Sequence, residues 1–223
     1  MTDRRIPQIS SRKQPKQARS NDLVAAILEA ATQVLVKEGA PRFTTARVAE
    51  KAGVSVGSIY QYFPNKAAIL FRLQRDEWQS TSRMLCDIIQ DTATPPMQRL
   101  RALVHAFVRS ECAEADMRAA LQDAAPLYRH APEAKDAHDE GYEAFGGFMG
   151  EVLPHLPIEA RTLAGDLVMN TLGAVGKAFS DSRRTDAEIT AYADAMADML
   201  CAYIDSLHRT DRQPGRRTAG RSS

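Results

Sequence analysis

The stretch TTARVAEKAGVSVGSIYQYFPNKAAIL, residues 44–70, contains two short helix-forming segments separated by a glycine. Thr44 or Thr45 is suited to cap the first helix. Gly53 is suited to end it, because glycine readily adopts the left-handed conformation that closes many helices. Ser55 is then placed to cap the second helix. Two helices joined by a tight turn within about twenty residues have the spacing of a helix-turn-helix unit.

The two helices of such a unit cross closely, so small and branched side chains are needed between them. We expect this contact to be formed by Val48, Ala49, Ala52, Val54, Ile59 and Phe63. The outward face is expected to carry Ser55, Val56, Ser58, Tyr60, Gln61 and Tyr62. None of the outward residues is acidic, which favours an approach to the phosphates of a nucleic acid.

Two groups of side chains in this stretch have the chemistry for contacts with double-stranded DNA. Hydroxyl and ammonium groups and the amides of a helix N-terminus bind phosphates, a role that we assign to Tyr60, Tyr62, Lys66, Thr44 and Thr45. Groups that pair with base edges or touch a thymine methyl read sequence, a role that we assign to Ser55, Val56, Ser58, Gln61 and Arg47. The alternative is a small structural helical bundle.

The stretch resembles the DNA-binding signature of tetracycline-repressor-like (TetR) transcriptional regulators. The resemblance covers roughly residues 20–70, and Val48 stands where the family usually has isoleucine. It implies a homodimeric regulator, usually a repressor, that a small ligand releases from a palindromic operator. The matching residues are Thr45, Val48, Ala49, Ala52, Gly53, Val54, Ser55, Gly57, Ile59, Tyr60, Tyr62, Phe63, Lys66 and Leu70.

Composition places the chain among globular proteins. Its 223 residues allow one domain of moderate size or a small domain joined to a larger one, and 44% of them are hydrophobic. No run approaches the ~18 apolar residues of a membrane span, and the charged start does not resemble a secretory signal. The three cysteines lie far apart without a C-x-x-C spacing. We therefore expect a protein of the reducing cytoplasm.

The charge of the chain is divided unevenly. Residues 1–75 hold 13 Lys and Arg against 5 Asp and Glu, a net charge of +8, whereas residues 76–223 hold 16 against 23, a net charge of −7. This division suits a nucleic-acid-binding head on a separate body, although solvated charges can also cluster by chance. The basic segment at residues 1–19, the leader, is either an arm that enters the minor groove or a solvated tail. We expect a tail that makes loose electrostatic contacts with DNA.

Hydrophobic spacing and helix breakers predict an all-α fold of about nine helices, with an N-terminal three-helix head and a larger helical body. The expected helices cover residues 21–39, 45–52, 55–63, 65–92, 97–113, 115–124, 133–153, 158–181 and 186–207. The expected domains are a disordered leader (1–19), a helix-turn-helix domain (20–68), a ligand-binding and dimerisation domain (69–208) and a disordered basic tail (209–223).

The last two expected helices are candidates for a dimer interface. Small residues in the first of them allow another helix to come close: Gly165, Gly173, Ala174, Gly176 and Ala178. The second has an apolar stripe formed by Ile189, Ala193, Met196, Met199, Leu200, Tyr203 and Ile204. Two copies of this pair would form a four-helix interface. The alternative is that both helices face only their own core.

The resemblance also implies an effector pocket among the central helices. Aromatic and methionine side chains form adaptable apolar cavities, and a few polar groups orient the ligand. We therefore expect an apolar or aromatic effector. The candidate lining residues are His105, Phe107, Met117, Leu121, Tyr128, Tyr142, Phe145, Phe148, Met149 and Met169.

Other classes of protein find less support in the sequence. The acidic run at residues 136–143 lacks the H-E-x-x-H spacing of a zinc enzyme, and no phosphate-binding loop or G-x-S-x-G motif is present. We expect no catalytic residue, no metal and no cofactor. The alternatives are a non-specific architectural DNA-binding protein, a transcriptional activator, a stand-alone ligand carrier, a redox sensor and a metal-dependent enzyme.

Overall fold

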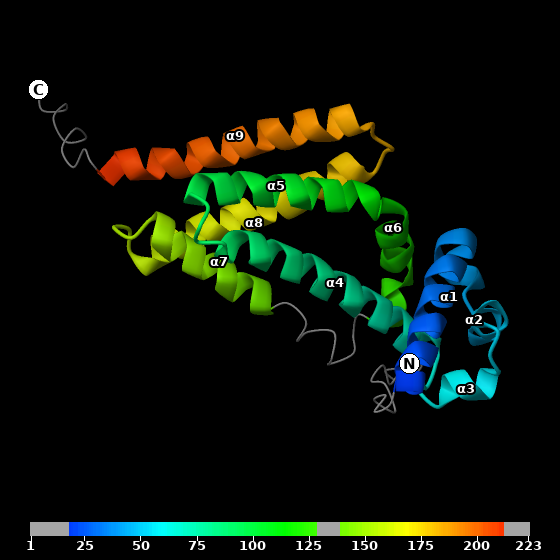
Figure 1. Cartoon of the computed structure of the whole chain (residues 1–223). Coiled ribbons are helices and arrows are strands. Elements are labelled where there is room, and N and C mark those ends of the chain that lie inside the picture. Colours follow the sequence, from blue (N-terminus) through cyan, green and yellow to red (C-terminus); the bar gives the residue numbers. More distant parts are fainter. Residues whose placement is uncertain (1–17, 129–138, 212–223) are drawn as a thin grey trace, which may run out of the picture. The chain divides into compact units, whose positions relative to one another are not determined.

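The computed structural model describes residues 18–128 and 139–211. Within these residues all regular structure is helical, which confirms the predicted all-α fold (Figure 1). The predicted leader and tail and the start of the helix expected at 133–153 lie largely outside the described residues. The elements are α1 (Ala18–Arg42), α2 (Thr45–Ala52), α3 (Val56–Tyr60), α4 (Lys66–Gln90), α5 (Pro96–Ala113), α6 (Ala115–Ala124), the 3-10 helix η1 (Ala125–Leu127), α7 (Asp139–Val152), α8 (Ile158–Ser180) and α9 (Asp186–Asp211).

The helix ends follow the local signals in the sequence. Gly39 has a φ of 75° and interrupts the helical geometry of α1 near its end. Gly53 has a φ of 68° and closes α2, while the Ser55 side chain caps α3. The carboxamide oxygen of Asn65 accepts a hydrogen bond from the backbone N–H of Ala68 at 2.9 Å, in the first turn of α4.

The chain folds into two compact units. The head unit contains residues 1–80 and 114–139, and the body unit contains the remainder. In the head unit, α6 packs against α1, although its residues lie in the predicted ligand-binding segment. The guanidinium of Arg118 on α6 also pairs with Glu77 on α4, with Nε and Oε1 2.9 Å apart. One apolar core therefore unites α1–α4 with α6, and its largest fully buried members include Ile27, Leu35, Phe43, Ile59, Phe63, Ile69, Leu70 and Leu121.

The body unit has its own core, in which α5 packs against both α8 and α9. Gly176 of α8 is required for this packing, because a Cβ added there would lie 2.7 Å from Cε1 of Phe107 on α5. Gly165 of α8 faces α7, where an added Cβ would make an ordinary contact 3.4 Å from Cγ of Met149, so a glycine is not required there. These two glycines serve contacts within one chain. In the described part of the chain, no helix is both long and apolar enough to cross a bilayer.

Candidate DNA-binding face and ligand cavity

The turn between α2 and α3 is built from short-range hydrogen bonds. The Thr44 hydroxyl accepts a hydrogen bond from the backbone N–H of Arg47 at 3.3 Å, which caps α2. At the other end, the N–H groups of Gly53 and Val54 donate to the carbonyls of Glu50 and Ala49. Such a closure needs a left-handed residue, and Gly53 supplies it. The orientation of α3 thus depends on this glycine.

Gly53→Ala should destabilise the head unit by about 1–2 kcal/mol, because an L-residue is strained at this φ. No atom lies within 4 Å of the added Cβ, so backbone strain is the whole effect. Urea unfolding of the full chain, followed by helical circular dichroism, measures the loss. Gly57→Ala is the matched control, because Gly57 lies inside α3 and its added Cβ makes only an ordinary contact with Ser55. Equal losses in the two variants would contradict the assignment.

The short helix α3 presents small polar and aromatic groups to solvent. The Ser55 hydroxyl accepts a hydrogen bond from the backbone N–H of Ser58 at 3.0 Å, and the two serine hydroxyls lie 2.8 Å apart. Val56, Tyr60 and Gln61 are exposed. Four of the predicted DNA-contacting residues on or beside α3 are therefore exposed, Ser58 is half-buried, and none of the five is acidic.

Two side chains predicted to bind DNA phosphates, Tyr60 and Lys66, each make a contact with the segment at the start of α2. The Tyr60 hydroxyl lies 3.3 Å from the Thr45 hydroxyl, which links the end of α3 to the start of α2. The Lys66 ammonium donates a hydrogen bond to the Phe43 carbonyl at 3.5 Å and is half-buried at the start of α4. Both groups are held in place before any partner arrives.

Arg47 is tied to another helix. Its guanidinium pairs with the carboxylate of Glu38 on α1, and the Arg47 side chain is still half-exposed. A contact between Arg47 and a base edge would therefore require the ion pair to open. The Glu38 side chain is only 25% exposed and its Oε2 is buried, so opening this pair would leave a partly buried carboxylate without its partner, which has a cost.

The prediction that Tyr62 lies on the outward face is wrong. Tyr62 is only 5% exposed and belongs to the core of the head unit. The physical reason is helical spacing, because Tyr62 and Phe63 follow the buried Ile59 by three and four positions and their N–H groups both donate to the Ile59 carbonyl. The outward face therefore carries Tyr60 but not Tyr62, and the i, i+3 and i+4 spacing of Ile59, Tyr62 and Phe63 is the sequence signal that separates the two tyrosines.

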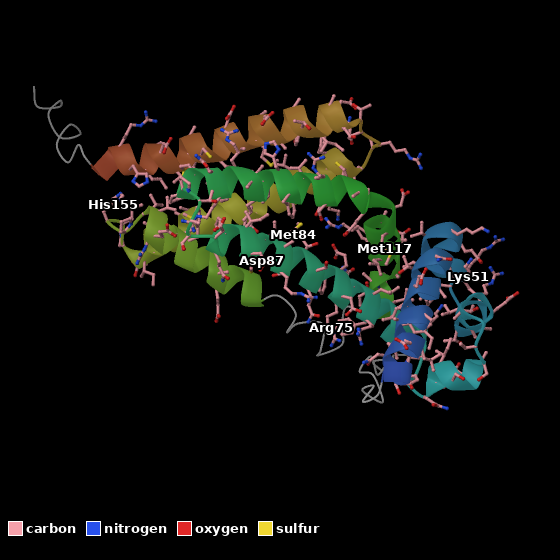
Figure 2. The ribbon with its side chains drawn as sticks, in the orientation of Figure 1. Lys51, Arg75, Met84, Asp87, Met117 and His155 are labelled. Atoms are coloured by element: carbon pink, nitrogen blue, oxygen red, sulfur yellow. The ribbon has the colours of Figure 1, made fainter. Side chains whose placement is uncertain are left out.

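Three of the predicted pocket residues belong to the head unit. Leu121 and Tyr128 are buried in its core, and Met117, labelled on α6 in Figure 2, packs against that core. The Tyr128 hydroxyl donates to the Leu121 carbonyl at 3.1 Å. Burial, with a smaller contribution from the charge of Glu77, raises the pKa of Tyr128 to about 12. Tyr128 is therefore a neutral hydrogen-bond donor that joins the end of α6 to the segment after it.

The remaining predicted pocket residues belong to the body unit. Phe145, Phe148 and Met149 are buried in its core, while Phe107 and Met169 are half-buried against it. His105 contacts Asp194, with Nε2 and Oδ1 3.0 Å apart. Tyr142 lies in α7, but its side chain is outside the described residues. Most of these side chains therefore fill the core of the unit.

A cavity of about 610 Å³ lies in the body unit between the end of α4, the start of α5 and α7. Of the predicted pocket residues, Phe148 lines this cavity. The residues that the sequence analysis missed include Arg99 and Glu151, which form an ion pair in the cavity wall. The sequence signal that could have placed Arg99 on the buried side of α5 is its spacing, because it precedes the buried Leu103 by one helical turn. The lining consists of Ser82, Arg83, Cys86, Ile89, Gln90, Thr92, Arg99, Glu143, Ala144, Gly147, Phe148 and Glu151.

The fold and this face define a helix-turn-helix DNA-binding protein with a helical second unit. Residues 27–73 match the model of bacterial regulatory proteins of the tetR family, and residues 95–207 match the tetracyclin repressor-like C-terminal domain. The chain belongs to the TetR family of transcriptional regulators. Within the described ranges, no group of three or more His, Cys, Asp or Glu side chains could hold a metal ion.

Known proteins of the same fold include two regulators named FadR. The fatty acid degradation regulator FadR from Bacillus halodurans has a TM-score of 0.64 and 20% identity, over 84% of this chain and 97% of that one. FadR from Bacillus subtilis in complex with stearoyl-CoA has a TM-score of 0.62 and 18% identity, over 80% and 98%. The nucleoid occlusion factor SlmA from Vibrio campbellii is 24% identical over an alignment of 163 positions, which covers 68% of this chain and 81% of SlmA. The two structural likenesses show the fold.

Proposed function

We propose that the chain is a homodimeric, sequence-specific transcriptional repressor that a small apolar or aromatic ligand releases from a palindromic operator. The observation that carries the proposal is the outward face of α3, where Ser55, Val56, Tyr60 and Gln61 are exposed together. This face combines groups for phosphates with groups for base edges, which is the combination that sequence-specific recognition needs. The repressor role is the usual outcome in the family.

Exposed apolar residues on α8 and on α9 support the homodimer. Leu163 is 70% exposed and Leu167, one turn further along α8, is 50% exposed, while Met199 is exposed on α9. Pairing with a second copy would remove this surface from water. Most of the predicted apolar stripe of α9 instead faces its own core, namely Ile189, Ala193, Met196, Leu200 and Ile204. The proposed interface is therefore centred on α8, with a smaller contribution from α9.

The proposed mechanism requires two heads at a fixed spacing. Each α3 would enter one major groove, and the half-sites would lie one or more helical turns apart, about 34 Å for each turn. A ligand in the body unit would favour an arrangement in which the two heads no longer fit neighbouring grooves. To move an equilibrium from almost fully bound to almost fully released, it needs a preference of about 5.5 kcal/mol for the released arrangement.

Lys66→Gln and Gln61→Ala should have different effects on DNA binding. Lys66→Gln removes a charge but keeps a donor for the Phe43 carbonyl, so affinity should fall for all sequences and the salt slope should decrease by about 1. Gln61→Ala should instead change base preference at one position, where a paired amide contributes about 1–3 kcal/mol of discrimination. Binding to the operator and to singly substituted duplexes at several salt concentrations measures both. A uniform loss for Gln61→Ala would contradict its role.

Selection of genomic fragments by the purified full chain at moderate salt, followed by sequencing, tests the proposed function. One inverted repeat among the selected fragments is the expected result. A reporter placed behind that repeat then distinguishes repression from activation. Weak binding without a shared motif would overturn the proposal and favour an architectural role.

A further inference from the structure

The side chain of Arg99 is fixed in the wall of the body-unit cavity. It is only 2% exposed. Its Nη1 donates to the Ile89 carbonyl at 2.6 Å, its Nη2 pairs with Glu151, and its guanidinium carbon lies 5.4 Å from the centre of the Phe148 ring. A buried cation with these contacts is held by α4 and α7 as well as by its own helix. It cannot leave the wall without a large loss of hydrogen bonding.

One N–H donor of the Arg99 guanidinium has no hydrogen-bond acceptor in the described part of the chain. Nε of Arg99 is buried and has no hydrogen-bond partner among the described residues. Nε and Nη2 form one edge of the guanidinium, with two parallel N–H groups that match the two oxygens of a carboxylate. Glu151 uses one half of this edge, through a single oxygen at Nη2. Within the described residues the edge therefore lacks an acceptor at Nε, and a buried donor without an acceptor is unfavourable.

Glu151 differs from Arg99 in its access to water. Its side chain is 44% exposed, so its carboxylate can turn into solvent at little cost, whereas Arg99 cannot. Another carboxylate could therefore replace it without leaving either charge buried and unpaired. The two other charged groups of the lining, Arg83 and Glu143, have opposite signs and do not select a charge for the ligand by themselves. Within the described lining, only in the Arg99–Glu151 pair is the cation fixed in the wall while the anion can turn away into solvent, and this difference favours an anionic ligand.

We propose that this cavity binds a small carboxylic acid through the Nε–Nη2 edge of Arg99, and that Glu151 is the internal competitor displaced by it. The apolar or aromatic body of the acid would lie against Phe148, Ala144 and Ile89. The cavity volume of about 610 Å³ lies within the range of small-molecule sites. This inference rests on the proposed function, because it names the chemical class of the effector.

Calorimetric titration of the full chain without DNA tests the inference. The probes are benzoate, phenylacetate and octanoate, each compared with its neutral primary amide. We expect saturable binding of at least one carboxylate, with its amide weaker by about tenfold or more, the scale of one charge-assisted hydrogen bond. Absence of binding by all three carboxylates, or equal binding of acid and amide, would overturn the inference.

Variants of the ion pair give a result that a merely structural pair would not. Glu151→Gln removes the competing charge and should tighten carboxylate binding by about tenfold. Arg99→Lys keeps the charge but loses the two-donor edge, and should weaken binding by about tenfold or more. Circular dichroism checks that Arg99→Lys is folded. If it is not, Glu151→Gln provides the test, because Glu151 is exposed and its replacement should not affect folding. Glu159→Gln, an exposed change outside the cavity, should leave binding unchanged. Weaker binding by Glu151→Gln would overturn the inference.

Operator release is measured separately, so that the two proposals can fail independently. A carboxylate that binds at Arg99 but leaves the operator complex intact supports the site and contradicts its role as effector site. An operator complex that responds only to ligands without a carboxylate supports the proposed repressor and overturns the inference.

Discussion

Phe63→Ala is expected to lower the free energy of unfolding of the head unit by about 3–5 kcal/mol and to abolish DNA binding near the melting temperature of the variant. The side chain is almost completely buried, and the residue lies three positions after the end of α3. Its backbone N–H also donates to the Ile59 carbonyl at 2.9 Å, so the ring and the backbone together fix the end of α3. A loss of this size is a large part of the 5–15 kcal/mol that stabilises a typical domain.

Urea denaturation and operator titration of the same sample measure the two effects of Phe63→Ala. Val56→Ala is the control, because Val56 is exposed on the outward face and its truncation should change stability by less than about 0.5 kcal/mol. Loss of DNA binding by the control would then report a lost contact with DNA. A change below about 1 kcal/mol for Phe63→Ala would show that the core of the head is not organised around this ring.

Replacing both Leu163 and Leu167 by aspartate is expected to convert the proposed dimer into a monomer. Two charges one turn apart on α8 would be desolvated and face their copies across the interface. Operator affinity should then fall by about 10²–10⁴-fold, because the second head is no longer held beside its half-site. Analytical ultracentrifugation and operator titration measure the two outcomes.

The matched control for the α8 double variant is Val36→Asp on α1, where an exposed apolar residue lies outside α8 and α9. Its oligomeric state should remain that of the unchanged protein. A dimer that persists in the double variant would place the interface elsewhere. A monomer that keeps full operator affinity would contradict the paired-head mechanism instead.

The features predicted well from the sequence are those decided within a few residues. Thr44, Gly53 and Ser55 act as the predicted caps, because capping and left-handed closure depend on one residue and its nearest neighbours. Pro95 and Pro96 likewise mark the break between α4 and α5. The prediction for Tyr62 is wrong because Tyr62 follows the buried Ile59 by three positions, a helical spacing that places it on the core side and not on the outward side with Tyr60.

The features predicted poorly depend on contacts between distant segments. The apolar stripe of α9 was recognised, but a stripe is equally apolar whether its own core or a second chain covers it. The cavity combines residues of α4, α5 and α7 that lie more than 50 positions apart, such as Arg99 and Glu151. Aromatic and methionine residues identified the core of the body unit, whereas the polar pair in the cavity wall required the three-dimensional arrangement.

The packing of α6 against α1 makes the DNA-binding head a split module. Leu121, Ala124 and Tyr128 belong to the same core as the first four helices, although more than thirty positions separate them from Ser80, the end of the first segment of the unit. In a hybrid regulator joined after Ser80, the first four helices would come from one protein and α6 from another. That α6 would then have to pack against an α1 to which it is not matched. Exchange of operator specificity between family members would require both segments to be transplanted together, or α6 to be refitted to its new neighbour.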